Sequence, residues 1–130
     1  MRAQASELEQ NEANNGQVLV ADSVGTPRVF TREDMLAALE GQPVMVQRIV
    51  YCECKYDPNV IRYRRDGSPL YYGCAQLMTG RGNGYDIFLR WGFDDWRDPD
   101  QVVGFINEVI RRGMLGSQYP NTQHGCPGSP

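Results

Sequence analysis

The amino-acid sequence predicts a small α+β domain: an antiparallel β-meander of three to five strands with two helices packed on one of its faces. Two observations lead to this prediction. The middle of the chain holds short runs of β-branched and aromatic residues joined by turn signals, and a segment with helical spacing lies on each side of it. Strands that follow one another through short turns pair as an antiparallel meander. A length of 130 residues suits one domain with a buried core.

Composition divides the chain into three parts. Residues 1–16 are polar and acidic and lack the apolar region of a secretory signal, so we expect them to be disordered. Residues 17–115 form the single α+β domain, and residues 116–130 form an irregular tail rich in Gly and Pro. No apolar run reaches the ~18 residues that a membrane span needs. The cytoplasm is therefore the predicted compartment.

The first two predicted elements are a strand and a helix. Residues 17–21 are a short apolar run, which favours a strand. Thr31 precedes two acidic residues and is placed as the N-cap of a helix that runs to about residue 40, with Gly41 as its stop signal. The residues expected on its buried face are Met35, Leu36 and Leu39.

A second strand and a hairpin follow. Pro43 opens the predicted strand over residues 44–51, which is rich in Val and Ile. Residues 60–65 and 70–78 are the two arms of the predicted hairpin, and Asp-Gly-Ser-Pro at residues 66–69 is its turn.

A glycine-rich connector, a strand and a second helix complete the domain. Residues 79–84 form the connector, and residues 85–91 alternate as in a strand. The second helix has the clearest signals, with Asp98 as N-cap, Pro99 at the first helical position and Gln101 placed as in a capping box. Its apolar residues recur at helical spacing: Val102, Phe105, Ile106, Val109 and Ile110.

The hairpin is the strongest candidate for a binding surface. Residues 43–91 hold seven basic and four acidic residues, and they are the only net basic part of a chain whose overall charge is −3. Arginine and tyrosine are enriched at binding hot spots. An ordinary solvated strand face with half-buried tyrosines explains the same pattern equally well. The predicted binding residues are Arg62, Tyr63, Arg64, Arg65, Tyr71 and Tyr72, with Arg81 in the glycine-rich connector.

An acidic loop at residues 94–98 is the second candidate surface. Asp94 and Asp95 lie between aromatic residues, and the loop lacks the spacing of an EF-hand. We expect a solvated loop anchored by Trp91, Phe93 or Trp96. An acidic loop can also mimic phosphate and occupy a nucleic-acid-binding groove of another protein.

The four cysteines and the single histidine are a candidate metal site. Cys52 and Cys54 point to the same side of an extended strand, Cys74 lies in the partner strand, and His124 and Cys126 lie in the tail. Such a set supplies a Cys₃His or Cys₄ zinc site. The Cys-x-x-Cys spacing of common zinc knuckles is absent, so small buried hydrophobes, a disulfide or free thiols are the alternatives, and no cofactor is the primary expectation.

These features favour a non-enzymatic binding protein. No nucleophile, phosphate-loop or metalloprotease motif occurs in its required context. The expected partner is a protein or a protein–nucleic-acid complex, bound through the hairpin and the acidic loop, without a membrane. Size and class, with no motif, suggest a phage or mobile-element inhibitor of a host system, of the anti-CRISPR kind. The alternatives are a single-strand nucleic-acid-binding module, stapled by zinc or not, and a small enzyme that uses the acidic loop or Cys126.

Overall fold

The computed structural model describes residues 29–130. The disordered segment predicted over residues 1–16 and the strand predicted over residues 17–21 lie outside the described residues. The elements are α1 (Arg32–Leu39), α2 (Val44–Cys54), β1 (Ile61–Tyr63), β2 (Pro69–Tyr72), β3 (Leu77–Met78), α3 (Gly84–Arg90), α4 (Pro99–Arg111) and α5 (Leu115–Gln118).

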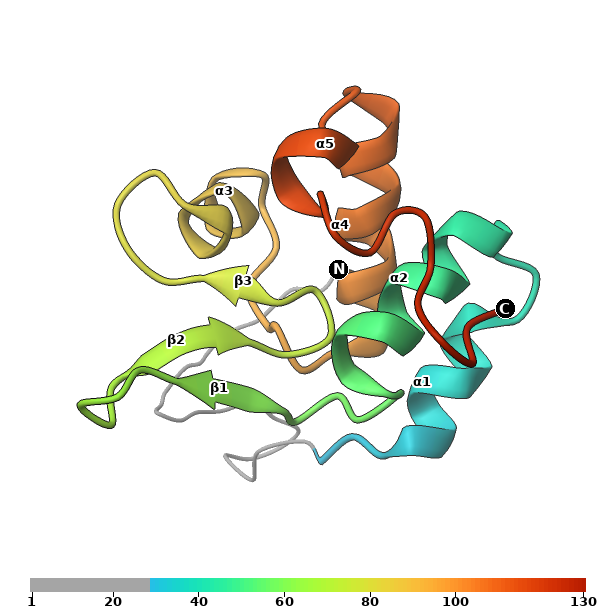
Figure 1. The fold of residues 1–130 in the computed structure, drawn as a ribbon, viewed down its shortest axis with the longest axis horizontal. Coiled ribbons are helices and arrows are strands. Elements are labelled where there is room, and N and C mark those ends of the chain that lie inside the picture. The colour runs from blue at the N-terminus through green and yellow to red at the C-terminus, as the bar shows by residue number, and fades with distance from the viewer. Residues whose placement is uncertain (1–28) are drawn as a thin grey trace.

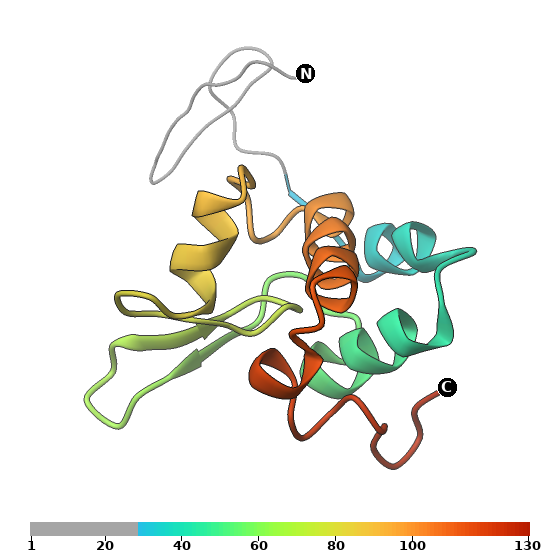
Figure 2. The same cartoon turned by 90° about the horizontal axis from the view of Figure 1, so that it is seen from above.

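The predicted α+β class is confirmed. One antiparallel sheet has the strand order β1-β2-β3, and its hairpin projects away from α1, α2 and α4, as both views show (Figures 1 and 2). The predicted packing of two helices on one sheet face is met only in part, because the described residues hold five helices and it is the short α3 that contacts β3. No helix within residues 29–130 is long and apolar enough to cross a membrane.

Helix α1 begins where its capping signal predicts. The Thr31 hydroxyl accepts a hydrogen bond from the Asp34 amide at 3.2 Å, and the Asp34 carboxylate accepts one from the Thr31 amide at 2.8 Å. This reciprocal pair satisfies two of the amides that a helix start leaves without partners. Met35 and Leu39 are buried as predicted, but Leu36 is 43% exposed and does not belong to the buried face.

Two predicted strands are helices. Residues 44–51 lie in α2 and residues 85–91 lie almost wholly in α3. In α2 the buried positions are spaced by three, four and eight residues, which is one face of a helix. The many β-branched residues favour a strand only weakly, and burial of this face against the core outweighs that preference. The buried residues of α2 are Val46, Ile49, Val50 and Cys54.

The hairpin is present, but its second arm is shorter than predicted. Ile61 pairs with Tyr72 and Arg62 with Tyr71, and a bulge follows Arg62. The chain turns at Gly73, where φ is +66°, and an added Cβ would lie 2.8 Å from the ring of Trp96. A glycine is therefore required there, and residues 77–78 return as the separate strand β3.

Side chains that lie opposite each other on paired strands share a face of the sheet. One face carries Ile61, Tyr72 and Leu77, and the other carries Arg62, Tyr71 and Met78. Leu77 is buried whereas Met78 is 38% exposed. The Arg62 face is thus the open side of the sheet.

Helix α4 supplies much of the core, and its start is confirmed. The Asp98 carboxylate accepts from the Asp100 amide at 3.0 Å, and Pro99 occupies the first turn. Gln101 does not close a capping box, since its side-chain oxygen accepts from the amides of Asp94 and Asp95 and so secures the preceding loop. The buried apolar residues of α4 are Val102, Val103, Phe105, Ile106 and Val109.

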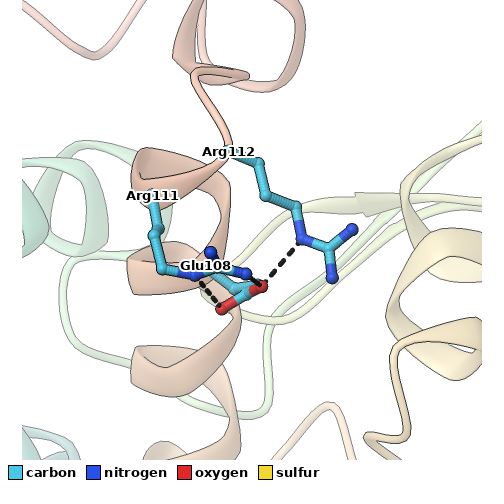
Figure 3. A network of polar contacts seen from close by, with 3 residues as sticks. All are labelled: Glu108, Arg111 and Arg112. Atoms are coloured by element: carbon cyan, nitrogen blue, oxygen red, sulfur yellow. Dashed lines mark hydrogen bonds and ion pairs between the residues drawn. The ribbon is translucent and has the colours of Figure 1, made fainter.

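The last turn of α4 carries an ion-pair network (Figure 3). Glu108 pairs with Arg111 and, at 2.7 Å, with Arg112. Both guanidinium groups lower the pKa of Glu108 to about 2 through their hydrogen bonds. Because the three side chains lie at the surface, water and salt screen this network.

The C-terminal segment packs back on α2 instead of ending as a loose tail. Tyr119 is buried, and its hydroxyl donates to the Ala75 carbonyl oxygen at 2.9 Å. A disulfide joins Cys126 to Cys52 of α2. In the view of Figure 1, the C-terminal segment runs across α2.

Candidate functional site

The four cysteines form two disulfides. Cys52 is bonded to Cys126, and Cys54 is bonded to Cys74. The expectation that Cys52 and Cys54 point the same way fails because the segment is a helix, in which residues two apart point about 200° apart around the axis.

The two disulfides also determine whether the predicted metal-ligating residues are able to bind zinc. A sulfur in a disulfide offers no thiolate to zinc. In the described part of the chain no group of three His, Cys, Asp or Glu side chains could hold a metal ion. His124 lies exposed in the C-terminal segment. The zinc reading of the cysteines and His124 is thus incompatible with this oxidised fold, and the disulfide alternative describes it.

Two of the hairpin arginines bind their own chain. The Arg62 guanidinium donates to the Gln76 side-chain oxygen at 2.8 Å and to the Glu53 carbonyl oxygen at 3.0 Å. The Arg64 guanidinium donates to the Thr79 hydroxyl at 3.0 Å. Both side chains therefore hold the hairpin to neighbouring segments.

The remaining predicted hairpin residues are more open. Tyr63 is 59% exposed, and Arg65 and Arg81 are exposed and form no hydrogen bond or ion pair with any described residue. Tyr71 lies half-buried on the open face of the sheet.

Tyr72 belongs instead to an aromatic cluster beside the acidic loop. Its ring stacks on Trp96 with centroids 5.0 Å apart and meets Tyr85 edge-on at 5.0 Å. Trp96 is 8% exposed, so the predicted aromatic anchor of the loop is confirmed. Asp94 is exposed, while burial raises the pKa of Asp95, whose carboxylate accepts from the Arg97 amide at 3.0 Å. Asp95 is thus half-buried and is held in a turn by the Arg97 amide.

A different carboxyl group, absent from the sequence predictions, has the surroundings of a functional site. Glu53 lies in the last turn of α2 and is half-buried. Its Oε2 atom accepts a hydrogen bond from the Thr122 hydroxyl at 2.7 Å. Burial raises the pKa of Glu53, while the Thr122 hydroxyl and the positive charges of Arg62 and Lys55 oppose that rise. Burial is the largest of these effects, so the net shift favours protonation of Glu53 relative to a free glutamic acid.

Other polar groups are fixed around Glu53 by their own contacts. Gln76 is held at both ends of its amide, because its oxygen accepts from Arg62 and its nitrogen donates to the Gly73 carbonyl oxygen at 2.8 Å. The buried hydroxyl of Tyr119 has its pKa raised well above the ordinary value, by burial first and by the Glu53 charge second. Four segments therefore meet here: the end of α2, the start of β1, the turn after β2, and the C-terminal segment.

Backbone strain marks the same region. Lys55, Tyr56 and Gln76 have φ values of +51°, +68° and +45°, and they are the non-glycine residues of the described chain with positive φ. Two of them directly follow the helix turn of Glu53, and the third contacts Arg62. Non-glycine residues in this conformation are uncommon and cluster at active sites and ligand clamps.

The strand that the sequence predicts over residues 44–51 ends before Glu53, so this prediction leaves Glu53 outside the regular structure and gives no reason to select it. In a helix, Glu53 follows Val46 by seven residues and Val50 by three, so it lies beside the buried stripe of α2. A carboxylate at the border of an apolar helix face is the signal that a helical reading would have given.

Comparison with known proteins shows no family. No family model and no solved structure matches the chain. The chain is similar to part of a protein named aconitate hydratase A from Streptomyces viridochromogenes, with 24% identity over 136 aligned residues that include 95% of this chain. It spans only 15% of the length of that protein. The predicted inhibitor role and the predicted protein or nucleic-acid partner remain predictions.

Proposed function

We propose that the protein is a glycoside-cleaving enzyme in which Glu53 is the general acid. The observation that carries this proposal is a half-buried glutamic acid of raised pKa at the end of a helix, with one carboxyl oxygen already bound by Thr122. In lysozyme, a glutamic acid in an apolar pocket has its pKa raised in the same sense and protonates the leaving oxygen of a glycosidic bond. This proposal replaces our expectation of a non-enzymatic protein.

The proposed first step is proton donation from Glu53. Its proton passes to the glycosidic oxygen while the bond from that oxygen to the anomeric carbon breaks, and the departing sugar leaves as a neutral alcohol. The Glu53 carboxylate that remains is stabilised by the Thr122 hydroxyl and the Arg62 guanidinium, both of which favour its charged form. In the second step the same carboxylate takes a proton from water.

The nucleophile in this proposal comes from the substrate. The charged side chains that shift the pKa of Glu53 are Arg62 and Lys55, both of them cationic, whereas the usual glycosidase pair consists of two carboxyl groups about 5–10 Å apart. Substrate-assisted glycosidases dispense with the second carboxylate. There, the carbonyl oxygen of a 2-acetamido group bonds to the anomeric carbon, and water later displaces it. The proposed substrate is therefore a polymer of N-acetylated amino sugars.

The open face of the sheet is the proposed platform for the sugar chain. Arg62 belongs both to this face and to the surroundings of Glu53, so the two surfaces are continuous. Tyr71 lies next to Arg62 on the face. Gln76 keeps one amide N–H for a sugar oxygen, because only one is used among residues 29–130. Flat aromatic rings and fixed polar donors are the groups that orient a ligand in a binding site.

The disulfides bear on the compartment in which this activity would take place. Disulfides persist in oxidising environments and are rare in the cytosol. Two of them in the described chain support an oxidising compartment, and so oppose our expectation of a cytoplasmic protein. Polysaccharides of cell surfaces are accessible in such compartments.

The proposal is tested by incubating the oxidised full-length protein with a hexamer of N-acetylglucosamine and with bacterial cell-wall glycan, and by detecting products by mass spectrometry. We expect cleavage by the wild type and a loss of about 10²–10⁴-fold in the Glu53→Gln variant, the usual contribution of a general acid. Glu33→Gln is the matched control, because Glu33 lies exposed at the start of α1. Absence of cleavage by the wild type, or full activity in Glu53→Gln, refutes the proposal.

A second candidate function is partner binding by the hairpin. It is favoured by the exposure of Tyr63 and by Arg65 and Arg81, whose charges are not paired within the described chain. The informative variant is Arg65→Glu/Arg81→Glu, since replacing Arg62 or Arg64 would break internal contacts. A partner or a single-stranded nucleic acid bound by the wild type and lost by this variant supports binding, and equal behaviour of both proteins removes it.

A further inference from the structure

The C-terminal strap, which we define as residues 119–126, is attached to the domain at three points around Glu53. The Tyr119 hydroxyl donates to the Ala75 carbonyl oxygen, the Thr122 hydroxyl donates to Glu53 at 2.7 Å, and Cys126 is bonded to Cys52. We propose that this strap is a positioning element: Thr122 selects the carboxyl oxygen of Glu53 that carries the proton, and the Cys52–Cys126 bond keeps Thr122 in place. The catalytic consequence rests on the proposed function, whereas the contact itself does not.

The selection follows from hydrogen-bond chemistry. A neutral carboxyl group has one oxygen that carries the proton and one that only accepts. The hydroxyl of Thr122 donates to Oε2 of Glu53, so in the neutral acid Oε2 is the accepting oxygen and the proton resides on Oε1. Without the hydroxyl, the proton could occupy either oxygen and the side chain could turn. A proton donor must be held in a productive geometry to act.

The disulfide is the part of the strap that fixes this geometry. Cys52 immediately precedes Glu53 in α2, so Cys126 is tied to the same helical turn as the acid. Thr122 lies between this bond and the buried Tyr119. The backbone hydrogen bonds from Gln123 to Tyr119 and from Gly125 to Thr122 are local to the strap. They shape the strap but do not attach it to α2.

The charged groups around Glu53 allow the effect of Thr122 to be isolated. Arg62 on β1 and Lys55 after α2 lower its pKa, and neither belongs to the strap. Tyr119 and His124 are the titratable groups of the strap itself, and both are retained when Thr122 is replaced. A change of the Glu53 pKa on replacing Thr122 therefore reports the hydroxyl.

The test is a pH titration by NMR of the full chain labelled with ¹³C at the glutamate carboxyl carbons, with Glu53→Gln used to assign the resonance. Because the hydroxyl lowers the pKa of Glu53, we expect Thr122→Val to raise it and Thr122→Ser to leave it near the wild-type value. The Cys52→Ser/Cys126→Ser variant should shift in the same direction as Thr122→Val. An unchanged or lowered pKa in Thr122→Val overturns the proposal, and that variant decides the matter even where the cysteine variant fails to fold.

Activity gives an independent readout. We expect kcat of Thr122→Val to fall by about tenfold to a hundredfold, with the alkaline limb of its pH profile moved to higher pH and Thr122→Ser restoring both. Higher activity in the Cys52→Ser/Cys126→Ser variant would overturn the proposal, because the strap would then obstruct access to Glu53 instead of holding Thr122 in place. A shifted pKa in a protein that cleaves no glycan would leave the positioning contact standing and would refute the proposed function alone.

Discussion

We expect the Cys54–Cys74 disulfide to stabilise the fold more than the Cys52–Cys126 disulfide, although the Cys52–Cys126 bond closes the longer loop. In the chain-entropy model a disulfide constrains the unfolded chain more strongly as the closed loop grows. The sequence separations of 74 for Cys52–Cys126 and 20 for Cys54–Cys74 correspond to about 4.4 and about 3.3 kcal/mol at 25 °C. Loop length alone therefore ranks Cys52–Cys126 first.

The folded state reverses this ranking. Cys54 and Cys74 are 5% and 0% exposed, so their bond joins α2 to the turn after β2 inside the core. Removing it leaves buried space as well as a freer unfolded chain. Cys126 lies half-exposed in the strap, which can detach beyond Tyr119 and regain conformational freedom without opening the core. We expect a loss of less than about 2 kcal/mol for the Cys52 bond and more than about 3 kcal/mol for the Cys54 bond.

The assay is urea unfolding at equilibrium of the oxidised wild type and of two variants, Cys52→Ala/Cys126→Ala and Cys54→Ala/Cys74→Ala. Each variant keeps the other disulfide and so serves as its control. Slopes and midpoints together separate a change in stability from a change in the surface exposed on unfolding. A larger loss for the Cys52 pair than for the Cys54 pair would refute the reasoning and return the explanation to loop length.

Three further predictions concern stability. Burial raises the pKa of Glu53 in the folded state above its ordinary 4.5. Between these two pKa values the folded state binds more protons than the unfolded state. The free energy of unfolding therefore falls as pH rises through this window. Urea unfolding of Glu53→Gln at pH 4 and pH 7 should show this slope removed and a stability gain over wild type that is larger at pH 7. Gly73→Ala should lower the free energy of unfolding by more than about 1 kcal/mol, because the added Cβ clashes with Trp96 and the backbone is strained at positive φ. Gly67 has open space around it, so Gly67→Ala should show the effect of the backbone strain alone. Tyr119→Phe should lose about 1–3 kcal/mol in the same assay, because a buried carbonyl oxygen loses its donor.

The elements that the sequence predicted correctly carry their information locally. The start of α4 follows from the adjacent Asp98 and Pro99, and that of α1 from Thr31 and Asp34, three residues apart. The hairpin turn follows from Asp66, whose carboxylate accepts from the Ser68 amide two residues on. In each case the interacting groups are near neighbours in sequence, so a residue pattern suffices.

Helices α2 and α3 differ from the strands predicted there because their local signals are weak or misleading. α2 has no side-chain hydrogen bond at its N-cap and many β-branched residues. α3 is only seven residues long, and its buried positions are Gly84 and Phe88. An added Cβ at Gly84 would lie 3.3 Å from the Met78 amide nitrogen, so the glycine allows the helix to approach β3 closely. Tertiary contacts such as this one decide short elements, and a single sequence does not display them.

The proposed site depends on residues that are far apart in the sequence. The hydroxyl that donates a hydrogen bond to Glu53 belongs to a residue 69 positions later. The segment that carries this hydroxyl is tied to α2 by a disulfide, and four cysteines allow three pairings. The helical reading gives the Cys-Glu-Cys triplet its meaning. Successive residues of α2 point about 100° apart, so Glu53 projects between two side chains that are bonded to different segments. The Cys54–Cys74 bond attaches this helical turn to the core, and the Cys52–Cys126 bond attaches the strap to the same turn. The cysteines that suggested a metal site therefore position the segments around Glu53.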